Sequence, residues 1–362
     1  MNYSLRQQKL AAELARYGVD ALLVTHLPNI RYLCGFTGSA GAMLIVAGKK
    51  APRVTLFTDG RYTQQAATEV QQGKVTISKQ PAWMAAALRA RQAGVSRLGF
   101  EPGHLTFALY QELSRQLRGK VSMKPVAGLT EHLREVKDSD EIEQIREAAA
   151  LGCGLFASVI AGICPGIAET TVAGELEKLA RSAGAEKMSF DTIVASGPRS
   201  ALPHGRASSH GIPDSGFIIL DYGVILAGYC SDMTRTVHVG PVSTKGRRMY
   251  ETVREAQLAS IAAVKPGAEA GDVDKAGREV IRKAGFGAYF THSTGHGVGI
   301  EIHESPRLAK GQTQKLVPGM IITIEPGVYL PDEGGVRIED MVLVTESGCE
   351  VLTPVSKDLA EL

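Results

Sequence analysis

Hydrophobic residues recur along the first third of the chain in the pattern of a layered α/β domain. Apolar side chains at helical spacing over residues 5–17, followed by Gly18, predict a helix that ends there. Short apolar runs predict strands, and further helical patterns separate them. The strands are expected at residues 20–25, 42–46, 53–57 and 98–100, and the helices at 62–70 and 107–117. This alternation predicts an α/β N-terminal domain over residues 1–125.

A second domain is predicted over residues 138–362, after a linker at residues 126–137. Asp138 stands three residues before Glu141, a pairing typical of a capped helix start. Caps and breakers predict three further helices, at residues 170–184, 243–264 and 273–284. A chain of 362 residues is long for one hydrophobic core, which also favours two domains.

Composition excludes several classes of protein. With 44% hydrophobic and 22% charged residues the chain is typical of globular proteins, and its net charge of +2 lacks the basic excess of a nucleic-acid-binding protein. Five scattered cysteines without a C-x-x-C spacing indicate neither a disulfide framework nor a thiolate zinc site. The first residues are polar and form no secretory signal, so a cytoplasmic location is expected.

Residues 148–168 carry no charge and raise the question of a membrane span. Pro165 and Gly166 interrupt the stretch near its end, and its glycines and alanines make it only weakly hydrophobic. A buried core helix is therefore the better interpretation, and no membrane partner is predicted.

An acidic residue follows each of two apolar strands, and the surrounding sequence is repeated. The runs Phe-Ile-Ile-Leu and Ile-Ile-Thr-Ile precede Asp221 and Glu325, and each acid is followed by any residue and then glycine. A second acid, Asp232 or Glu339, comes 11 or 14 residues later. These spacings suit a hairpin, which places the acid of one strand beside that of its neighbour.

Four carboxylates brought together predict a divalent metal site. Like charges a few ångströms apart disfavour ionisation, and a cation removes that conflict. Any one of these acids could simply cap a strand at a surface turn, but a repeated set of four makes that interpretation weaker. Arg337 and Glu339 are two residues apart and share one face of the last strand, which must therefore look into a polar environment.

Histidines add ligand and proton-transfer chemistry to this repeat. His292, His296 and His303 lie within twelve residues, and His204 stands in a separate loop segment. The glycines around His296 let the backbone approach a neighbour closely. A phosphate-binding loop is disfavoured, because no Lys-Ser/Thr pair follows these glycines and no βαβ fingerprint frames them.

With these residues assembled, the chain resembles the creatinase, aminopeptidase P and prolidase family over nearly its whole length. The similarity includes residues 29–38 and 59–62 in the first domain and every metal-ligand motif in the second. The resemblance implies a creatinase-type N-terminal domain, followed by an α+β pita-bread catalytic domain with a duplicated, pseudo-twofold antiparallel sheet.

The resemblance also implies the metal ligands, residue by residue. Asp221 would bind one metal, His296 and Glu325 the other, while Asp232 and Glu339 would bridge both. Two divalent ions per subunit are expected, and the oxygen-rich set favours manganese, with cobalt or zinc able to substitute. No ligand position is missing, which favours an enzyme over the non-catalytic, protein-binding relatives that have lost ligands.

The implied activity is that of a metallo-exopeptidase acting on peptides with proline in the second position. A short N-terminal domain favours an Xaa-Pro aminopeptidase, and so does the similarity of residues 189–197 to small bacterial Xaa-Pro aminopeptidases. An Xaa-Pro dipeptidase (prolidase) is the alternative. Methionine aminopeptidase shares the ligand types, but the first domain, residues 335–340 and the histidine arrangement oppose it. A homodimer is also expected from the resemblance.

Roles can be assigned to the remaining site residues as hypotheses. Glu325 would accept a proton from the attacking water, while His303 or His204 would donate hydrogen bonds to the developing oxyanion. Arg337 would orient Asp232 and Glu339 or contact the substrate. The expected catalytic residues are His204, His303, Glu325 and Arg337, and the expected substrate-binding residues are His204, His292, His303 and Arg337.

Three assignments stay open between two interpretations. His292 either lines the pocket for the proline ring or forms a hydrogen bond to backbone beside its loop. Tyr229 either forms a hydrogen bond near the metals or has a purely structural role. Asp59 to Arg61 form a turn or reach the active-site mouth of a neighbouring subunit.

Overall fold

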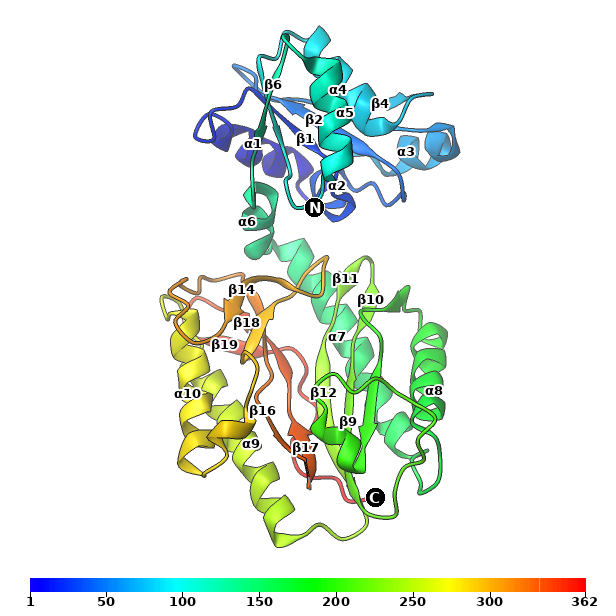
Figure 1. Cartoon of the computed structure of the whole chain (residues 1–362), viewed down its shortest axis with the longest axis vertical. Helices are drawn as coiled ribbons and strands as arrows, with labels where there is room; N and C mark the ends of the chain where they lie inside the picture. The colour runs from blue at the N-terminus through cyan, green and yellow to red at the C-terminus, as the bar shows by residue number, and fades with distance from the viewer. Residues whose placement is uncertain (332) are drawn as a thin grey trace. The chain divides into compact units, whose positions relative to one another are not determined.

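The computed structural model describes residues 1–331 and 333–362, which form two compact units, Met1–Arg134 and Glu135–Leu362 (Figure 1). Helix α6 (Leu129–Glu135) lies within the stretch that the sequence suggested as a linker. The predicted domain boundaries themselves stay a prediction.

The Met1–Arg134 unit is built on one mixed sheet of six strands, in the order β4-β3-β2-β1-β5-β6. Its strands are β1 (Ala21–Val24), β2 (Ala42–Val46), β3 (Arg53–Thr58), β4 (Lys74–Ile77), β5 (Arg97–Phe100) and β6 (Ser122–Pro125). Its helices are α1 (Tyr3–Glu13), α2 (Leu27–Cys34), α3 (Thr63–Glu69), α4 (Ala82–Gln92) and α5 (Phe107–Leu117), with the 3-10 turn η1 (Gly60–Tyr62). The predicted α/β layer is confirmed.

Local differences from the prediction have physical causes. Helix α1 ends at Glu13, and residues 14–18 form a tight turn that ends at Gly18, with φ +64°. Val19 N closes this turn by donating to the carbonyl of Leu14. Strands β4 and β6 were not predicted, because they are the largely exposed edges of the sheet and lack an apolar run. The Asp59 to Arg61 segment forms a turn, in which the Asp59 carboxylate accepts from the Arg61 backbone and guanidinium.

The Glu135–Leu362 unit contains antiparallel sheets flanked by helices, and each ladder between its named strands is antiparallel. Figure 1 shows the strands between α8 on one side and α9 and α10 on the other. Its helices are α7 (Ser139–Ile160), α8 (Glu169–Ser182), α9 (Thr244–Ala263) and α10 (Ala270–Lys283), with η2 (Gly197–Ala201) and η3 (Gly287–Tyr289). The predicted capping box of Asp138 and Glu141 is confirmed at the start of α7.

The strands of this unit form two three-stranded sheets, one five-stranded sheet and one two-stranded sheet. The first half of the unit contributes β7 (Lys187–Met188), β8 (Ile193–Ser196), β9 (Gly216–Tyr222), β10 (Val224–Leu226), β11 (Tyr229–Cys230) and β12 (Met233–Val239). The second half contributes β13 (Gly295–Gly297), β14 (Glu304–Leu308), β15 (Ile321–Ile324), β16 (Gly327–Leu330), β17 (Gly334–Arg337), β18 (Asp340–Val344) and β19 (Cys349–Val351).

Each half of the unit contains one long hairpin that is interrupted near its middle. In the first, β9 pairs with β12 and β10 pairs with β11, and both ladders keep one register. In the second, β15 pairs with β18 and β16 pairs with β17, again in one register. The duplicated strand–acid pattern of the sequence therefore corresponds to a duplicated hairpin.

Two apolar clusters hold the helices on these hairpins. One joins α7 and α8 to β8, β9 and β12, with Leu176, Val194 and Leu220 fully buried. The other joins α9 to β16 and β17, with Val253, Val328 and Val336 fully buried. Since apolar burial is the main driving force for such packing, both hairpins have a rigid support. Of the helices in the described part of the chain, none combines the length and apolar character needed to cross a membrane.

Candidate active site

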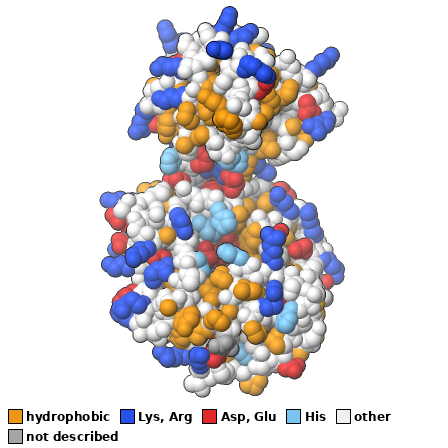
Figure 2. Space-filling view, viewed as in Figure 1, with side chains coloured by type: hydrophobic (Ala, Val, Ile, Leu, Met, Phe, Trp, Pro, Cys, Tyr) orange, Lys and Arg blue, Asp and Glu red, His pale blue; other side chains and the backbone are white. Residues whose placement is uncertain are grey.

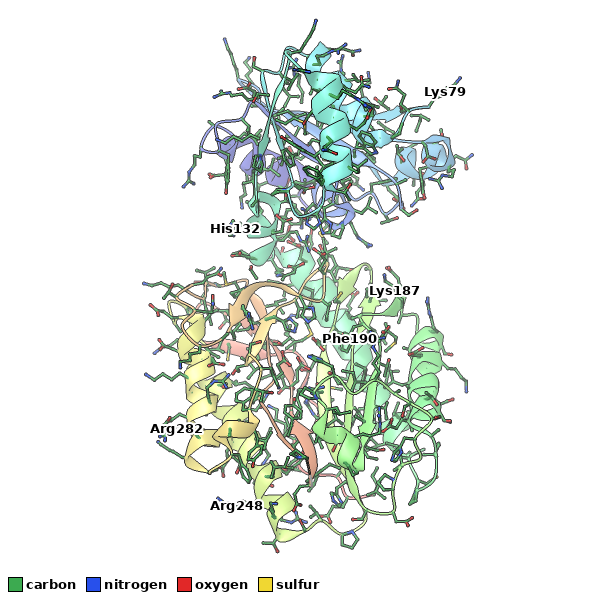
Figure 3. All side chains as sticks on the ribbon, in the orientation of Figure 1. Lys79, His132, Lys187, Phe190, Arg248 and Arg282 are labelled. Carbon is green, nitrogen blue, oxygen red and sulfur yellow. The ribbon has the colours of Figure 1, made fainter. Side chains whose placement is uncertain are left out.

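A cavity of about 810 Å³ opens in the Glu135–Leu362 unit. In Figure 2 pale-blue histidine side chains surround red acidic side chains on the visible face of this unit. Phe190, labelled in Figure 3, lies on the cavity wall. The cavity brings together all the predicted site residues, namely His204, Asp221, Asp232, His292, His296, His303, Glu325, Arg337 and Glu339.

The acids lie where the two hairpins are interrupted. Ile324 pairs with Asp340 and Gly327 pairs with Arg337 in the same register, so Glu325 stands opposite Glu339. In the first hairpin Asp221 pairs with Thr234, two residues beyond Asp232. Asp232, Glu325 and Glu339 lie outside the named strands, whereas Asp221 lies within β9. The two hairpins present all four carboxylates to one cavity.

His296 faces this group with an unprotonated nitrogen. Its Nδ1 lies 3.0 Å from the carbonyl oxygen of Gly297, which can only accept, so Nδ1 carries the proton. The remaining nitrogen, Nε2, lies 3.6 Å from Oδ2 of Asp232 and 3.7 Å from Oε1 of Glu325. The lone pair of the imidazole nitrogen therefore faces carboxylate oxygens at distances too long for hydrogen bonds.

Burial makes the charged state of this group costly. Desolvation, followed by repulsion from neighbouring carboxylates, raises the pKa of Asp232 and of Glu339 well above their usual range. Desolvation likewise raises the pKa of Glu325 to about 8 and lowers the pKa of His296 to about 4. Each group is thus held towards its neutral form in the absence of a cation.

The residues present fit a divalent metal. Two ligand atoms that each lie about 2.1 Å from a cation are at most about 4.2 Å apart, and both contacts of His296 Nε2 meet that limit. One ligand atom from each of Asp232, His296 and Glu339 lies within 4.8 Å of the others. Among the described residues, buried Oδ1 of Asp232 has no hydrogen-bond partner. A cation would satisfy that oxygen and the imidazole together.

Arg337 connects the two hairpins beneath the acids. Its Nη2 donates to Oδ2 of Asp221 at 2.6 Å. Its Nε donates to the hydroxyl of Thr234 at 3.3 Å, and that hydroxyl donates to Oε2 of Glu339 at 2.7 Å. The sequence suggested that Arg337 orients Asp232 and Glu339 or contacts the substrate. In the structure the guanidinium binds Asp221 directly and is linked to Glu339 through Thr234. The reason is that Asp221 and Thr234 pair across β9 and β12.

His292 forms part of a hydrogen-bonded chain that begins at the same guanidinium. Nη1 of Arg337 donates to the Tyr329 hydroxyl at 2.8 Å, and this hydroxyl lies 2.8 Å from Nε2 of His292. Nδ1 of His292 lies 2.8 Å from the carbonyl oxygen of Ser293, so Nδ1 carries the proton and Nε2 accepts from Tyr329. His292 therefore binds the backbone and also lines the cavity, while its contact with the proline ring stays a prediction. Burial lowers its pKa to about 4.

His204 and His303 are the exposed imidazoles of the cavity wall. The His303 ring meets the His296 ring edge-on, with centroids 4.4 Å apart, and partial burial lowers the pKa of His303. The loop that carries His204 is held by the buried Glu169 carboxylate, which accepts from the backbone and hydroxyl of Ser208. An imidazole at either position can donate a hydrogen bond to the substrate.

The sequence did not point to several residues of the site. Tyr329 and Thr234 carry no local motif, and Thr234 could have been suspected only from its position two residues after Asp232. Arg307 also lines the cavity, with an exposed side chain. Tyr229 is absent from the described cavity lining, and its hydroxyl donates to Glu141 in the capping box of α7 at 3.1 Å.

Comparison with known proteins places these features in context. The family model described as metallopeptidase family M24 matches residues 143–346, and that of the creatinase/prolidase N-terminal domain matches residues 6–136. An uncharacterized peptidase of Bacillus subtilis is 41% identical, covering 98% of this chain and 99% of its own. An Xaa-Pro dipeptidase of Pyrococcus furiosus is 37% identical, covering 98% and 99%. The solved Xaa-Pro dipeptidase from Bacillus anthracis is 40% identical, with a TM-score of 0.96 and full coverage of both chains. These matches confirm the predicted fold class, a creatinase-type domain with a pita-bread catalytic domain.

Proposed function

Because the chain belongs to metallopeptidase family M24, we propose that it hydrolyses the peptide bond between an N-terminal residue and a proline in the second position. The observation that carries the proposal is the convergence of two carboxylate-bearing hairpins and His296 on one cavity, beside further imidazoles. The similarity to proteins named Xaa-Pro dipeptidase supports this substrate class.

Five residues would hold the divalent metal on which this family depends. They are Asp221, Asp232, His296, Glu325 and Glu339. We propose two ions per subunit, with manganese as the first choice because oxygen ligands predominate. When bound, the metal supplies Lewis acidity, which polarises the scissile carbonyl and lowers the pKa of the attacking water.

The remaining site residues move protons and position groups. The Glu325 carboxylate, at the end of β15, lies in the cavity where it can accept the proton of the attacking water. His204 and His303 have exposed side chains on the wall and donate hydrogen bonds to the oxyanion as it develops. Arg337 orients the Asp221 carboxylate through its short hydrogen bond.

Arg307 favours a dipeptide as the substrate. It lines the cavity with an exposed side chain, and within the described part of the chain its guanidinium has no hydrogen bond or ion pair. In an Xaa-Pro dipeptide the proline carries the free C-terminal carboxylate, and a guanidinium binds carboxylates bidentately. An available guanidinium in the wall therefore suits a dipeptide better than a longer peptide, in which that carboxylate lies further away.

Aminopeptidase action on longer peptides is the second candidate, and the size of the cavity favours it. A volume of about 810 Å³ lies towards the upper end of the range of about 300–1,000 Å³ typical of ligand pockets. The cavity therefore has space beyond the proline for a further residue. This is the Xaa-Pro aminopeptidase suggested by the sequence.

Three matched substrates test these candidates. Metal-stripped protein reconstituted with Mn²⁺ is assayed on Ala-Pro, on its C-terminal amide and on Ala-Pro-Ala. A dipeptidase should cleave Ala-Pro faster than the amide and faster than Ala-Pro-Ala. The replacement Arg307→Gln should abolish this preference for the free carboxylate. Arg118→Gln, which changes an exposed arginine outside the cavity, is the matched control.

The other outcomes are equally specific. Equal or faster cleavage of Ala-Pro-Ala would support the aminopeptidase. Cleavage of no substrate by wild type, with metal bound, would instead favour a non-catalytic protein-binding role. Asp232→Ala should abolish activity on every substrate, which excludes a contaminating peptidase.

A homodimer is part of the same proposal, and it follows from the resemblance to relatives that assemble as dimers. Sedimentation equilibrium of the full chain tests it. A mass of twice 38.5 kDa would support a dimer, while a mass of 38.5 kDa would exclude it at that concentration.

A further inference from the structure

We propose that Asp274 and Arg278, on the outer helix α10, are positioning residues that set the His292 loop on the wall of the substrate cavity. This inference rests on the proposed function for its kinetic consequence. Neither residue carries a sequence motif, and they are linked to the site through Thr294, the 290–292 backbone and the Phe290 ring.

The pair is fixed on the inner side of the helix. Asp274 is 1% exposed. Arg278 forms a two-point contact with it, from Nε to Oδ2 at 2.9 Å and from Nη2 to Oδ1 at 2.7 Å. A bidentate arrangement to a buried carboxylate leaves the guanidinium plane little freedom.

The same guanidinium also binds backbone carbonyls of the segment that carries His292. Nη1 of Arg278 donates to the carbonyl of Phe290 at 3.0 Å, and Nη2 donates to the carbonyl of His292 at 2.8 Å. Its Cζ also lies 4.0 Å from the centre of the Phe290 ring, a cation–π contact. The Phe290 ring in turn meets the His292 ring edge-on, with centroids 5.1 Å apart. The backbone and the ring of His292 are therefore both supported from Arg278.

Asp274 extends the support towards Glu325. Its Oδ1 accepts from the hydroxyl of fully buried Thr294 at 2.8 Å. The carbonyl of Thr294 accepts from the backbone N–H of Glu325 at 2.7 Å. The pair thus touches the segment that carries His292 on one side and the backbone of a candidate ligand on the other.

The expected consequence falls on substrate binding. His292 lines the cavity, and its Nε2 accepts from Tyr329, so a shift of the loop moves both this hydrogen bond and the cavity wall. Among the described residues, no hydrogen bond or ion pair joins Arg278 to the side chain of a candidate metal ligand. Loss of Arg278 should therefore raise KM for the dipeptide more than it lowers kcat.

A second pair on α10 provides a matched control. Arg282, labelled in Figure 3, contacts Glu279 with the same two-point geometry, at 2.8 and 2.7 Å. Among the described residues its guanidinium makes no hydrogen bond to a loop carbonyl. Its side chain is 64% exposed, whereas that of Arg278 is 29% exposed. A role limited to helix stability would make both pairs respond alike.

The experiment compares Arg278→Met, Arg278→Lys and Arg282→Met with wild type as metal-loaded full chains. Arg278→Met should raise KM for Ala-Pro about tenfold, with kcat within about threefold and metal content unchanged. Arg278→Lys keeps the charge beside Asp274 but lacks the planar fork, so it should fold and show an intermediate KM. Arg282→Met should match wild type.

Histidine-selective ¹⁵N NMR of the metal-free protein gives a readout that does not depend on turnover. The His292 signals, assigned by their loss in His292→Gln, should shift in Arg278→Met and stay in place in Arg282→Met. Unchanged His292 signals in both Arg278 variants, or an equal rise of KM in Arg282→Met, would overturn the proposal. If wild type cleaves no Xaa-Pro substrate, the proposed function fails, and the His292 signals still decide the positioning role.

Discussion

Arg337 Nη2 lies 2.6 Å from Asp221 Oδ2, and this contact joins the two interrupted hairpins of the catalytic domain. The same side chain donates to Thr234 and Tyr329, which lead to Glu339 and His292. One guanidinium thereby orients side chains from both halves of the duplicated unit.

Replacing Arg337 by lysine should weaken metal binding and turnover. A lysine amine is a point donor and cannot serve Asp221, Thr234 and Tyr329 together. Losing a residue that forms a hydrogen bond to a metal ligand typically lowers metal affinity or activity by about 10–100-fold. Competition titration of Mn²⁺ and kcat/KM on Ala-Pro measure both effects. Arg254→Lys, in a surface pair on α9, is the control, and equal values for both variants would contradict the assigned role.

Metal should stabilise the protein through Asp232. Free metal at one hundred times its Kd adds about 2.7 kcal/mol to the free energy of unfolding, which raises Tm by about 5–10 °C. Scanning calorimetry with Mn²⁺ and with a chelator should show that difference in wild type. In Asp232→Ala the difference should vanish, because the bridging carboxylate is gone. A metal-dependent rise that persists in the variant would exclude Asp232 as a ligand.

His292 should make the folded protein sensitive to acid. Its pKa is lowered to about 4 by burial, against 6.5 for an unperturbed histidine. A depressed pKa contributes stability that is present above pH 6.5 and is lost as pH falls from 6.5 towards 4. At pH 4.5 the loss amounts to roughly 2 to 3 kcal/mol. His292→Gln should therefore show a smaller fall in stability between pH 7 and 4.5, measured by urea unfolding with chelator present.

The exposed His210 provides the comparison, since His210→Gln should retain the full acid sensitivity of wild type. An unchanged pH dependence in His292→Gln would mean that the imidazole is solvated or charged in the folded protein.

Gly295 should not tolerate a side chain. A Cβ at this position would lie 1.9 Å from the carbonyl oxygen of Thr323 on the neighbouring strand. The strands would have to separate beside His296, so Gly295→Ala should lose metal binding and activity together. Gly154→Ala on α7, where nothing lies within 4 Å of the added Cβ, should keep both. Isothermal titration with Mn²⁺ measures the effect, and full affinity in Gly295→Ala would contradict the close approach.

The sequence by itself determined the chemistry of the site and much of the fold. Apolar runs, helical spacing and capping pairs are local signals, so they located β2, α5 and the capped start of α7. The repeated strand–acid unit identified the four acidic residues, because a buried strand must end in a turn whatever packs around it. The prolyl specificity and the separate roles of the ligands came from resemblance to a family and stay proposals.

Only the tertiary structure decided which partners these residues meet. The exposed edge strands β4 and β6 exist through pairing with distant neighbours and have no apolar signature of their own. Arg337 contacts Asp221 across 116 residues of chain, and Tyr329 joins His292 across 37. Such contacts depend on strand register and on how two hairpins pack, and these are set by the free energy of the whole fold. Local sequence patterns cannot specify them, because they constrain only neighbouring residues.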